Sequence, residues 1–219
     1  MDIKSTNLFH LLSSFIDAYF KGLRMKRPLF FSGFPGLRFD LQDEDFNISE
    51  DAYFGQVAKR MERIHAITIN GDDDIIIFYR ENTYKRRKIR KSSYLFKQIN
   101  AATAQVQFKK SKSTIYGNGI YFKVNNCSQV IIYDKAANIE FSNIYLSIAN
   151  VDFNREPTIR GDLFVVNLTK QTMMLMYDDR GCDLISPNRE ILKRFYDSLN
   201  ELILEENIPE IIQSLRIDS

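Results

Sequence analysis

Apolar residues recur at helical spacing in the N-terminal part of the chain, and they predict two helices there. Residues 5–23 carry one such stripe, with Thr6 or Asn7 as the expected N-cap. A second stripe runs over residues 49–66, and acidic side chains at its start suit the positive end of a helix. Both helices are amphipathic, so each is expected to pack one face against a core.

The rest of the chain contains further helical patterns. Ser186 and Pro187 predict the start of a C-terminal helix, because serine caps helices and proline suits the first turn. Pro209 interrupts that pattern, and the apolar residues after it suggest a short final helix. We also expect a helix over 92–102. The segment 140–151 fits a helix face and could also extend a sheet; we favour the helix.

Other segments carry strand patterns. The continuous apolar run 75–79 predicts a strand buried on both faces. Prolines and glycines punctuate residues 26–41, which read as a hairpin with an aromatic-rich turn. Between two alternating runs, residues 109–119 are expected to form a long turn or a mobile hairpin tip. The other expected strands are 104–108, 120–124, 129–134, 163–168, 172–176 and 184–185.

These elements together predict an α+β fold. We expect a mostly antiparallel sheet of about five to seven strands, with helices packed on it that include the N-terminal and C-terminal helices. No internal repeat, low-complexity tract or linker divides the chain. A single domain over residues 1–219 is therefore expected, although the helix within residues 1–25 could be an appendage.

Composition narrows the function classes only slightly. The chain has 219 residues, 44% of them hydrophobic, and its 30 basic and 28 acidic residues give a net charge of +2. Any nucleic-acid or membrane interaction must therefore come from local clustering. Cys127 and Cys182 are too far apart for a zinc motif. The chain shows no secretory signal pattern and no apolar run near the roughly 18 residues of a membrane span, so we expect a cytoplasmic protein with reduced thiols.

A basic run over residues 85–91 is the densest charge cluster. Such a run can bind nucleic acid through phosphates, and tyrosine and phenylalanine residues on both sides of it suit single-stranded RNA or DNA. A solvated segment is the ordinary alternative, and an acidic protein partner is a third. The residues that could contact nucleic acid are Lys85, Arg86, Arg87, Lys88, Arg90 and Lys91.

The segment 177–183 is the most chemically loaded part of the chain. It places three carboxylates, an arginine, a tyrosine and a thiol within seven residues, directly after an apolar run. Gly181 fits a turn that needs a positive φ. Asp183 could pair with Arg180, Arg160 or Arg38. The candidate binding residues are Arg38, Asp40, Tyr177, Asp178, Asp179, Arg180 and Asp183.

Three kinds of chemistry are conceivable for this segment. Its carboxylates could hold a divalent cation for hydrolysis, or act as acid and base. Cys182 could be a nucleophile only with a histidine nearby, and neither His10 nor His65 has a sequence tie to it. The plain alternative is a tight turn held by Asp–Arg pairs. We assign no catalytic residue, metal or cofactor, and we interpret the aspartates at 72–74 as a solvated turn.

One segment reads Y-D-D-R-G-C-D at 177–183, and another reads P-L-F-F at 28–31 followed by G-L-R-F-D at 36–40. Both segments resemble a bacterial family of uncharacterised proteins, domain of unknown function 3885. The chain departs from the family pattern at Phe31 and Asp40, where tyrosine and glutamate are usual, and in its basic run. The resemblance implies kinship of fold and no activity. It also suggests that the segments around Arg38 and Arg180 meet in space.

The leading functional hypothesis is a non-enzymatic protein-binding module. It follows from the lack of a catalytic constellation and from many aromatic and acidic residues that suit a protein interface. By analogy with other small bacterial proteins, the module could be immunity- or antitoxin-like, with a toxin as its partner. The alternatives are a nucleic-acid-binding protein that uses residues 85–91, and a carboxylate-based metal-dependent hydrolase at Asp178, Asp179 and Asp183.

Overall fold

A seven-stranded antiparallel sheet forms the centre of the molecule, with strand order β1-β7-β6-β5-β2-β4-β3. This computed structural model describes residues 7–43, 51–82, 88–117 and 120–216, and for 82, 112–117 and 120–126 it describes the backbone alone. The strands are β1 (Gly36–Asp40), β2 (Asp74–Asn82), β3 (Gln105–Gly117), β4 (Ile120–Lys135), β5 (Asp162–Asn167), β6 (Thr172–Met176) and β7 (Gly181–Ile185).

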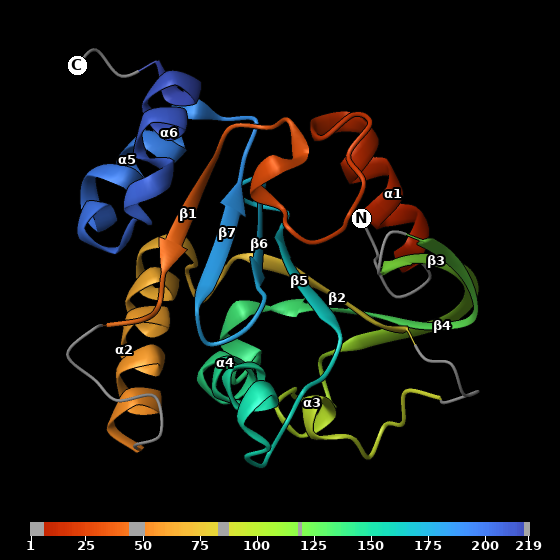
Figure 1. Ribbon diagram of the computed structural model, residues 1–219. Coiled ribbons are helices and arrows are strands. Elements are labelled where there is room, and N and C mark those ends of the chain that lie inside the picture. Colours follow the sequence, from red (N-terminus) through yellow and green to blue (C-terminus); the bar gives the residue numbers. More distant parts are fainter. Residues whose placement is uncertain (1–6, 44–50, 83–87, 118–119, 217–219) are drawn as a thin grey trace.

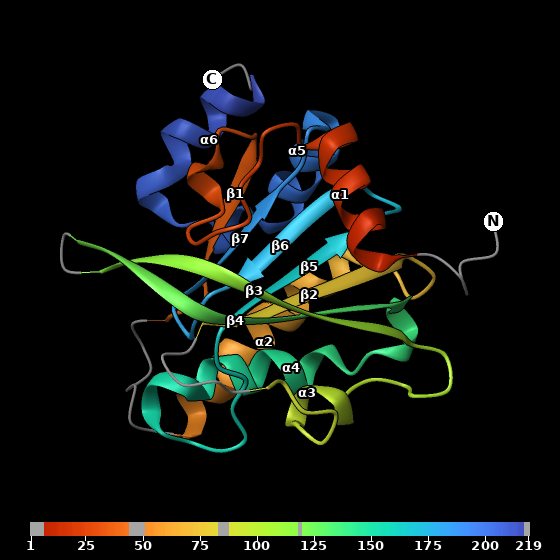
Figure 2. The ribbon, with the colours of Figure 1, turned by 90° about the vertical axis from the view of Figure 1, so that its right-hand side faces the viewer.

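Helices cover both faces of this sheet (Figures 1 and 2). They are α1 (Leu8–Tyr19), α2 (Asp51–Thr68), α3 (Tyr94–Lys97), α4 (Phe141–Ala149), α5 (Arg189–Leu199) and α6 (Ile208–Leu215). The α+β fold class is confirmed, and so are the helices near both ends of the chain. No helix in the described ranges is long and apolar enough to cross a membrane.

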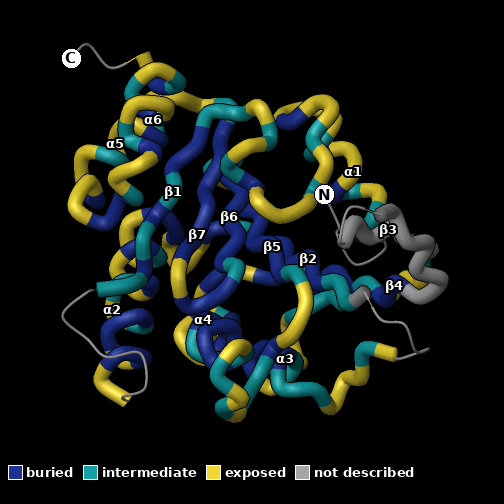
Figure 3. Tube along the Cα trace, viewed as in Figure 1, coloured by how far each residue is buried: buried dark blue, intermediate teal, exposed yellow. Residues whose placement is uncertain are grey.

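Strand β2 shows how the core is divided. Ile75 and Ile77 point to the face covered by α2 to α6, whereas Ile76 and Phe78 point to the face covered by α1. All four are buried, which confirms the expected strand with two buried faces. Strands β5, β6 and β7, which follow β2 on one side in the sheet, are likewise buried along most of their length (Figure 3). The sheet is therefore the middle of three layers.

Helix α1 lies on the second face and is tied to the sheet edge. Asn7 caps it, because its side chain accepts the amide protons of Phe9 and His10. Leu8 is buried with the core of that face, and its amide donates to the Gln107 side chain of β3 at 2.8 Å. The N-terminal helix thus contributes to the same core as the strands.

The expected hairpin over 26–41 is wrong. Residues Phe30–Ser32 form a turn of 3-10 helix, and only Gly36–Asp40 is a strand, which pairs with β7. The reason is a distant acceptor: the backbone amides of Leu29 and Phe30 donate to the carboxylate of Asp183 and so cannot pair with β1.

Four further elements differ from the sequence predictions. The helix expected over 92–102 shrinks to α3, because the backbone of Ile99 forms a bridge with Ile139 instead. The two strands expected between 120 and 134 are one continuous strand, β4, and β3 reaches into the segment expected as a long turn. Helix α5 is capped by Asn188 rather than Ser186, whose hydroxyl accepts from the Asn188 amide at 3.1 Å.

The aspartates at 72–74 are not a purely solvated turn. Asp73 is buried, and its carboxylate accepts from the Asn70 amide at 2.8 Å and from the Asn167 side chain at 2.7 Å. Lys170 lies 3.3 Å from the same carboxylate oxygen. Asp73 therefore joins the end of α2 to the β5–β6 turn.

His65 gives the protein a pH-dependent stability. It packs between α2 and α4, where its ring contacts Phe141 and its Nδ1 lies 2.9 Å from the Tyr145 hydroxyl. Burial lowers the pKa of His65 from 6.5 to about 4. The unfolded chain therefore binds a proton that the folded protein excludes as pH falls below 6.5, and we expect a loss of about 2 to 3 kcal/mol between pH 7 and pH 4.

The measurement is urea unfolding across this pH range for the wild type and His65→Gln. We expect a flatter pH profile for the variant, while His10→Gln, which changes an exposed residue of α1, should keep the wild-type slope. Burial raises the pKa of Asp179 and Asp183, but both are present in each protein and cancel in the difference. Parallel profiles for the wild type and His65→Gln would contradict this role.

Candidate functional site

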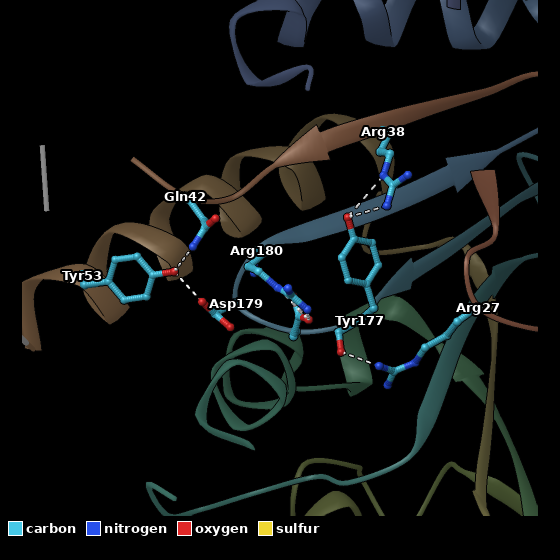
Figure 4. A network of polar contacts seen from close by, with 8 residues as sticks. Arg27, Arg38, Gln42, Tyr53, Tyr177, Asp179 and Arg180 are labelled. Carbon is cyan, nitrogen blue, oxygen red and sulfur yellow. Dashed lines mark hydrogen bonds and ion pairs between the residues drawn. The ribbon is translucent and has the colours of Figure 1, made fainter. Parts of the chain in front are cut away.

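The pairing of β1 with β7 brings the two arginine-bearing segments together, as the sequence suggested. Arg38 stands opposite Asp183 in the ladder, and Asp40 stands opposite Gly181. The loop 177–181 then places its side chains at one end of these strands (Figure 4). Asp40 takes no part in this cluster through its carboxylate, which accepts from the Gln42 amide at 2.9 Å.

Asp183 is the buried acceptor of the site. Its side chain is fully buried, and one oxygen accepts from the amides of Leu29 at 2.8 Å and Phe30 at 3.0 Å. Its other oxygen lies 3.4 Å from the Arg38 Nε but makes no hydrogen bond within the described part of the chain. Burial raises the pKa of Asp183, while the two amides and Arg38 act in the opposite direction. Of the three arginines considered, Asp183 thus pairs with Arg38.

Arg38 lies between two aromatic rings. Its guanidinium carbon is 5.4 Å from the centre of the Phe31 ring and 5.6 Å from that of Tyr177. It also donates to the Tyr177 hydroxyl from two nitrogens, each at 3.4 Å (Figure 4). Burial raises the pKa of Tyr177 to about 12, so the phenol is protonated at neutral pH. The arginine therefore holds the loop and the Phe31 segment against β1.

Asp179 connects the same loop to helix α2. Its carboxylate accepts from the Tyr53 hydroxyl, which in turn accepts from the Gln42 side chain at 3.0 Å (Figure 4). Burial raises the pKa of Asp179 and raises that of Tyr53 to about 12. Both groups lie inside the molecule and already have partners.

Asp178 and Arg180 form a local pair. The Asp178 carboxylate accepts from the Arg180 amide at 2.9 Å and from its Nε at 3.1 Å, so it closes the turn as an aspartate commonly does. The Arg180 side chain is 64% exposed, which makes it the accessible charge of the loop.

The carboxylates do not group as the hydrolase hypothesis expected. Among the described residues, Asp178 and Asp179 come together with Asp152, and an oxygen of each lies within 4.8 Å of the others. Asp183 is not part of this group. The two buried members already accept hydrogen bonds from Arg180 and Tyr53, so each has a partner within the protein.

Cys182 lacks the exposure that a nucleophile requires. Both Cys127 and Cys182 are free and buried. Burial raises the pKa of Cys182 well above its usual value, which keeps the thiol protonated. The thiol therefore acts as a small apolar side chain of the core.

Gly181 is needed for space rather than for a positive φ, so the conformational reason given from the sequence is wrong. Among the glycines that the structure describes, those with positive φ are Gly22, Gly33 and Gly161. A Cβ on Gly181 would overlap the Tyr177 hydroxyl oxygen and would lie 2.9 Å from the Phe39 carbonyl oxygen. The glycine allows Tyr177 to fold back over β7 and reach Arg38.

Sequence reasoning missed Arg27, which clamps the loop from outside. Its Nε lies 2.6 Å from the Asp162 carboxylate, and its other nitrogens donate to the carbonyls of Tyr177 at 2.9 Å and Gly161 at 2.8 Å. Arg80 shares the same carboxylate at 2.7 Å. The only sequence signal was the position of Arg27, directly before the P-L-F-F segment.

A surface groove next to this cluster was also missed. It has a volume of about 420 Å³, and its walls are residues of the segment 30–36 on one side and Arg189, Glu210 and Ser214 on the other. Phe31 is 61% exposed here, although it is a large apolar side chain. We call this the Phe31 groove. The hairpin predicted for residues 26–41 gave no indication of a groove there.

The structure describes only part of the basic run over residues 85–91. Lys85, Arg86 and Arg87 lie outside the described residues, whereas Lys88, Arg90 and Lys91 are exposed. None of these three belongs to the cluster around Arg38.

Comparison with known proteins gives a family and one distant relative. The family model described as Domain of unknown function (DUF3885) matches residues 12–207. A Bacillus subtilis (strain 168) protein described as "Uncharacterized protein YnaE" is 22% identical over 218 residues, which cover 89% of this chain and 97% of the relative. No solved structure matches the chain.

Proposed function

Because the chain belongs to the family described as a domain of unknown function (DUF3885), whose description states no activity, we propose a function from the surface of this chain: it is a non-enzymatic protein-binding module. The observation that carries the proposal is the Phe31 groove, where an aromatic ring that is 61% exposed stands beside a hollow of about 420 Å³. An exposed aromatic side chain next to a groove is typical of protein interfaces.

The burial and hydrogen bonding of the segment 177–183 support a non-enzymatic role. Asp183, Asp179 and Cys182 are buried, and the two carboxylates already accept hydrogen bonds from the protein. A catalytic acid, base or nucleophile must reach a substrate. The loop instead positions the segment that carries Phe31, through Arg38 and through the two amides that Asp183 accepts.

The groove also indicates what a partner must offer. Phe30, Phe34 and Pro35 give it an apolar lining, while Arg189 and Glu210 add one charge of each sign. An apolar or aromatic anchor residue with polar neighbours fits such a surface. We propose a folded protein partner that inserts one such residue, and a toxin neutralised by this module is the specific form of the proposal.

The test is the replacement of Phe31 by alanine. Removing an interface aromatic commonly weakens binding by about 2 kcal/mol or more, so we expect roughly a thirtyfold loss of affinity. Partners captured from a bacterial lysate by the tagged protein would be identified, purified and titrated against each variant by calorimetry.

Ile67→Ala is the matched control, because Ile67 is 40% exposed on α2, outside the groove. A partner that binds the wild type and Ile67→Ala equally and loses affinity for Phe31→Ala supports the proposal. Equal binding by all three proteins would place the interface elsewhere, and an absence of any stoichiometric protein partner would count against the whole function.

A further inference from the structure

A second hollow lies between the segment 88–91 and the β3–β4 ribbon. Its volume is about 290 Å³, and one wall consists of Lys88, Ile89 and Lys91. The opposite wall consists of residues 108–110 of β3 and 128–129 of β4. We call it the lysine hollow. Residues 108–110 and 128–129 lie well beyond residue 91 in the sequence, so only the fold brings the two walls together.

The charge of the lysine hollow has one sign. Lys88, Lys91, Lys109 and Lys110 line it, and each is exposed. None of the described residues that line it is acidic. The nearest carboxylate along the ladder is Glu81, which stands opposite Ser128 and already accepts from the Tyr79 hydroxyl. The hollow therefore concentrates positive charge on a chain whose net charge is only +2.

An aromatic ring stands among these lysines. Phe108 is 45% exposed, although a large apolar residue on a strand usually faces the core. The Phe96 ring stacks against it with a centroid distance of 5.8 Å and an interplanar angle of 29°, which braces it from the α3 side. Lys109, the next residue of the strand, points to the other face of the sheet, where its ammonium lies 5.3 Å from the centre of the Phe9 ring of α1, so the cations on the Phe108 side are those of the other three lysines. The hollow thus combines cations with a supported π surface.

We propose that the lysine hollow binds a single-stranded nucleic acid, with the ammonium groups against phosphates and Phe108 stacked on a base. Phosphate contacts alone would need only the lysines, whereas the exposed ring requires a ligand with a flat apolar face. A single strand offers that face, because duplex bases are already stacked on one another. An acidic polypeptide offers the charge without the bases, and it forms one arm of the test.

The experiment measures fluorescence anisotropy of a labelled single strand of about 12 nucleotides, as RNA and as DNA, at several salt concentrations. The logarithm of the binding constant falls by about 0.7 per contacted phosphate for each decade of salt. Lys91→Ala combined with Lys110→Ala should reduce this slope by about 1.4 and weaken binding at low salt. The matched control is Lys59→Ala with Lys193→Ala, which removes the same charge from exposed sites outside the hollow and should leave the slope unchanged.

Substitutions of Phe108 test the stacking part. Phe108→Leu should weaken binding about tenfold without changing the salt slope, and Phe108→Tyr should restore wild-type affinity. Thermal unfolding of each variant checks that the fold is intact, and the lysine variants decide the matter if Phe108→Leu fails to fold. The proposal is overturned if both double variants lose affinity equally, if polyglutamate competes as well as the unlabelled single strand, or if a duplex binds more tightly.

Discussion

Replacing Asp183 with alanine is expected to lower the free energy of unfolding by about 3 to 5 kcal/mol, because it breaks a buried ion pair from one side. The change leaves the amides of Leu29 and Phe30 without their acceptor and leaves Arg38 without its counter-charge. Native proteins are stable by only about 5 to 15 kcal/mol, so this loss brings the variant close to unfolding. Urea unfolding followed by circular dichroism would measure it.

Two further variants define the origin of this effect. Asp183→Asn keeps the size of the side chain and one carbonyl acceptor, so it should cost less than alanine. Asp197→Ala changes an exposed residue of α5 and should stay within about 0.5 kcal/mol of the wild type. A loss below about 1 kcal/mol for Asp183→Ala would mean that the amides of Leu29 and Phe30 find other partners, and that the buried acceptor is dispensable.

Gly181→Ala is the second large effect, and we expect a loss of about 3 kcal/mol in the free energy of unfolding. The added methyl group would overlap the Tyr177 hydroxyl and press on the Phe39 carbonyl of the paired strand. The hydroxyl can move only by giving up Arg38, and the carbonyl belongs to a β ladder. Thermal or urea unfolding of the purified variant would show the loss.

The control for this change is another glycine. Gly55→Ala places a methyl group on α2, where nothing lies within 4 Å, and alanine suits a helix interior better than glycine. It should therefore raise stability by about 0.5 to 1 kcal/mol. Combining Gly181→Ala with Tyr177→Leu removes the clashing hydroxyl and should recover part of the loss. Equal stability of Gly181→Ala and the wild type would refute the steric role assigned to this glycine.

The local pattern of apolar residues correctly predicted the elements whose structure depends on burial alone. The run at 75–79 predicted β2, and the runs at 163–168 and 172–176 predicted β5 and β6, because each strand is buried and apolar. The final helix was also expected, and Pro209, which was predicted to interrupt the pattern before it, lies in its first turn. Such elements depend on neighbours that are close in sequence or on the core as a whole.

The predictions failed where the local structure depends on one group that is distant in the sequence. The segment before β1 cannot be a strand because Asp183 occupies its amides, and nothing near residue 29 in the sequence reveals that acceptor. Gly181 was interpreted as a turn glycine. A glycine is needed there because the Tyr177 ring, four residues earlier, folds back over this position. The resemblance of two segments to one family was the best guide here, since it pointed to the meeting of Arg38 with the 177–183 loop.

The sequence predicted which residues make up the candidate site, but it did not predict how far they are exposed to solvent. The sequence shows three carboxylates and a thiol within 177–183, and it does not show that Asp183 and Cys182 are buried. Burial depends on β1 lying beside β7, a pairing between strands at opposite ends of the chain. The exposed groups that support the proposals, Phe31 and Phe108, lie outside that segment.

The hydrogen bond from the Leu29 amide to Asp183 spans 154 positions, and this has a consequence for synthesis on the ribosome. Strand β1 leaves the ribosome long before β7, which is its ladder partner among the described strands. Until then the nascent chain exposes an unpaired apolar strand, which is a risk for aggregation. We therefore expect β1 to reach its native pairing only after residue 185 has left the ribosome, and chains released before that residue to depend on chaperones.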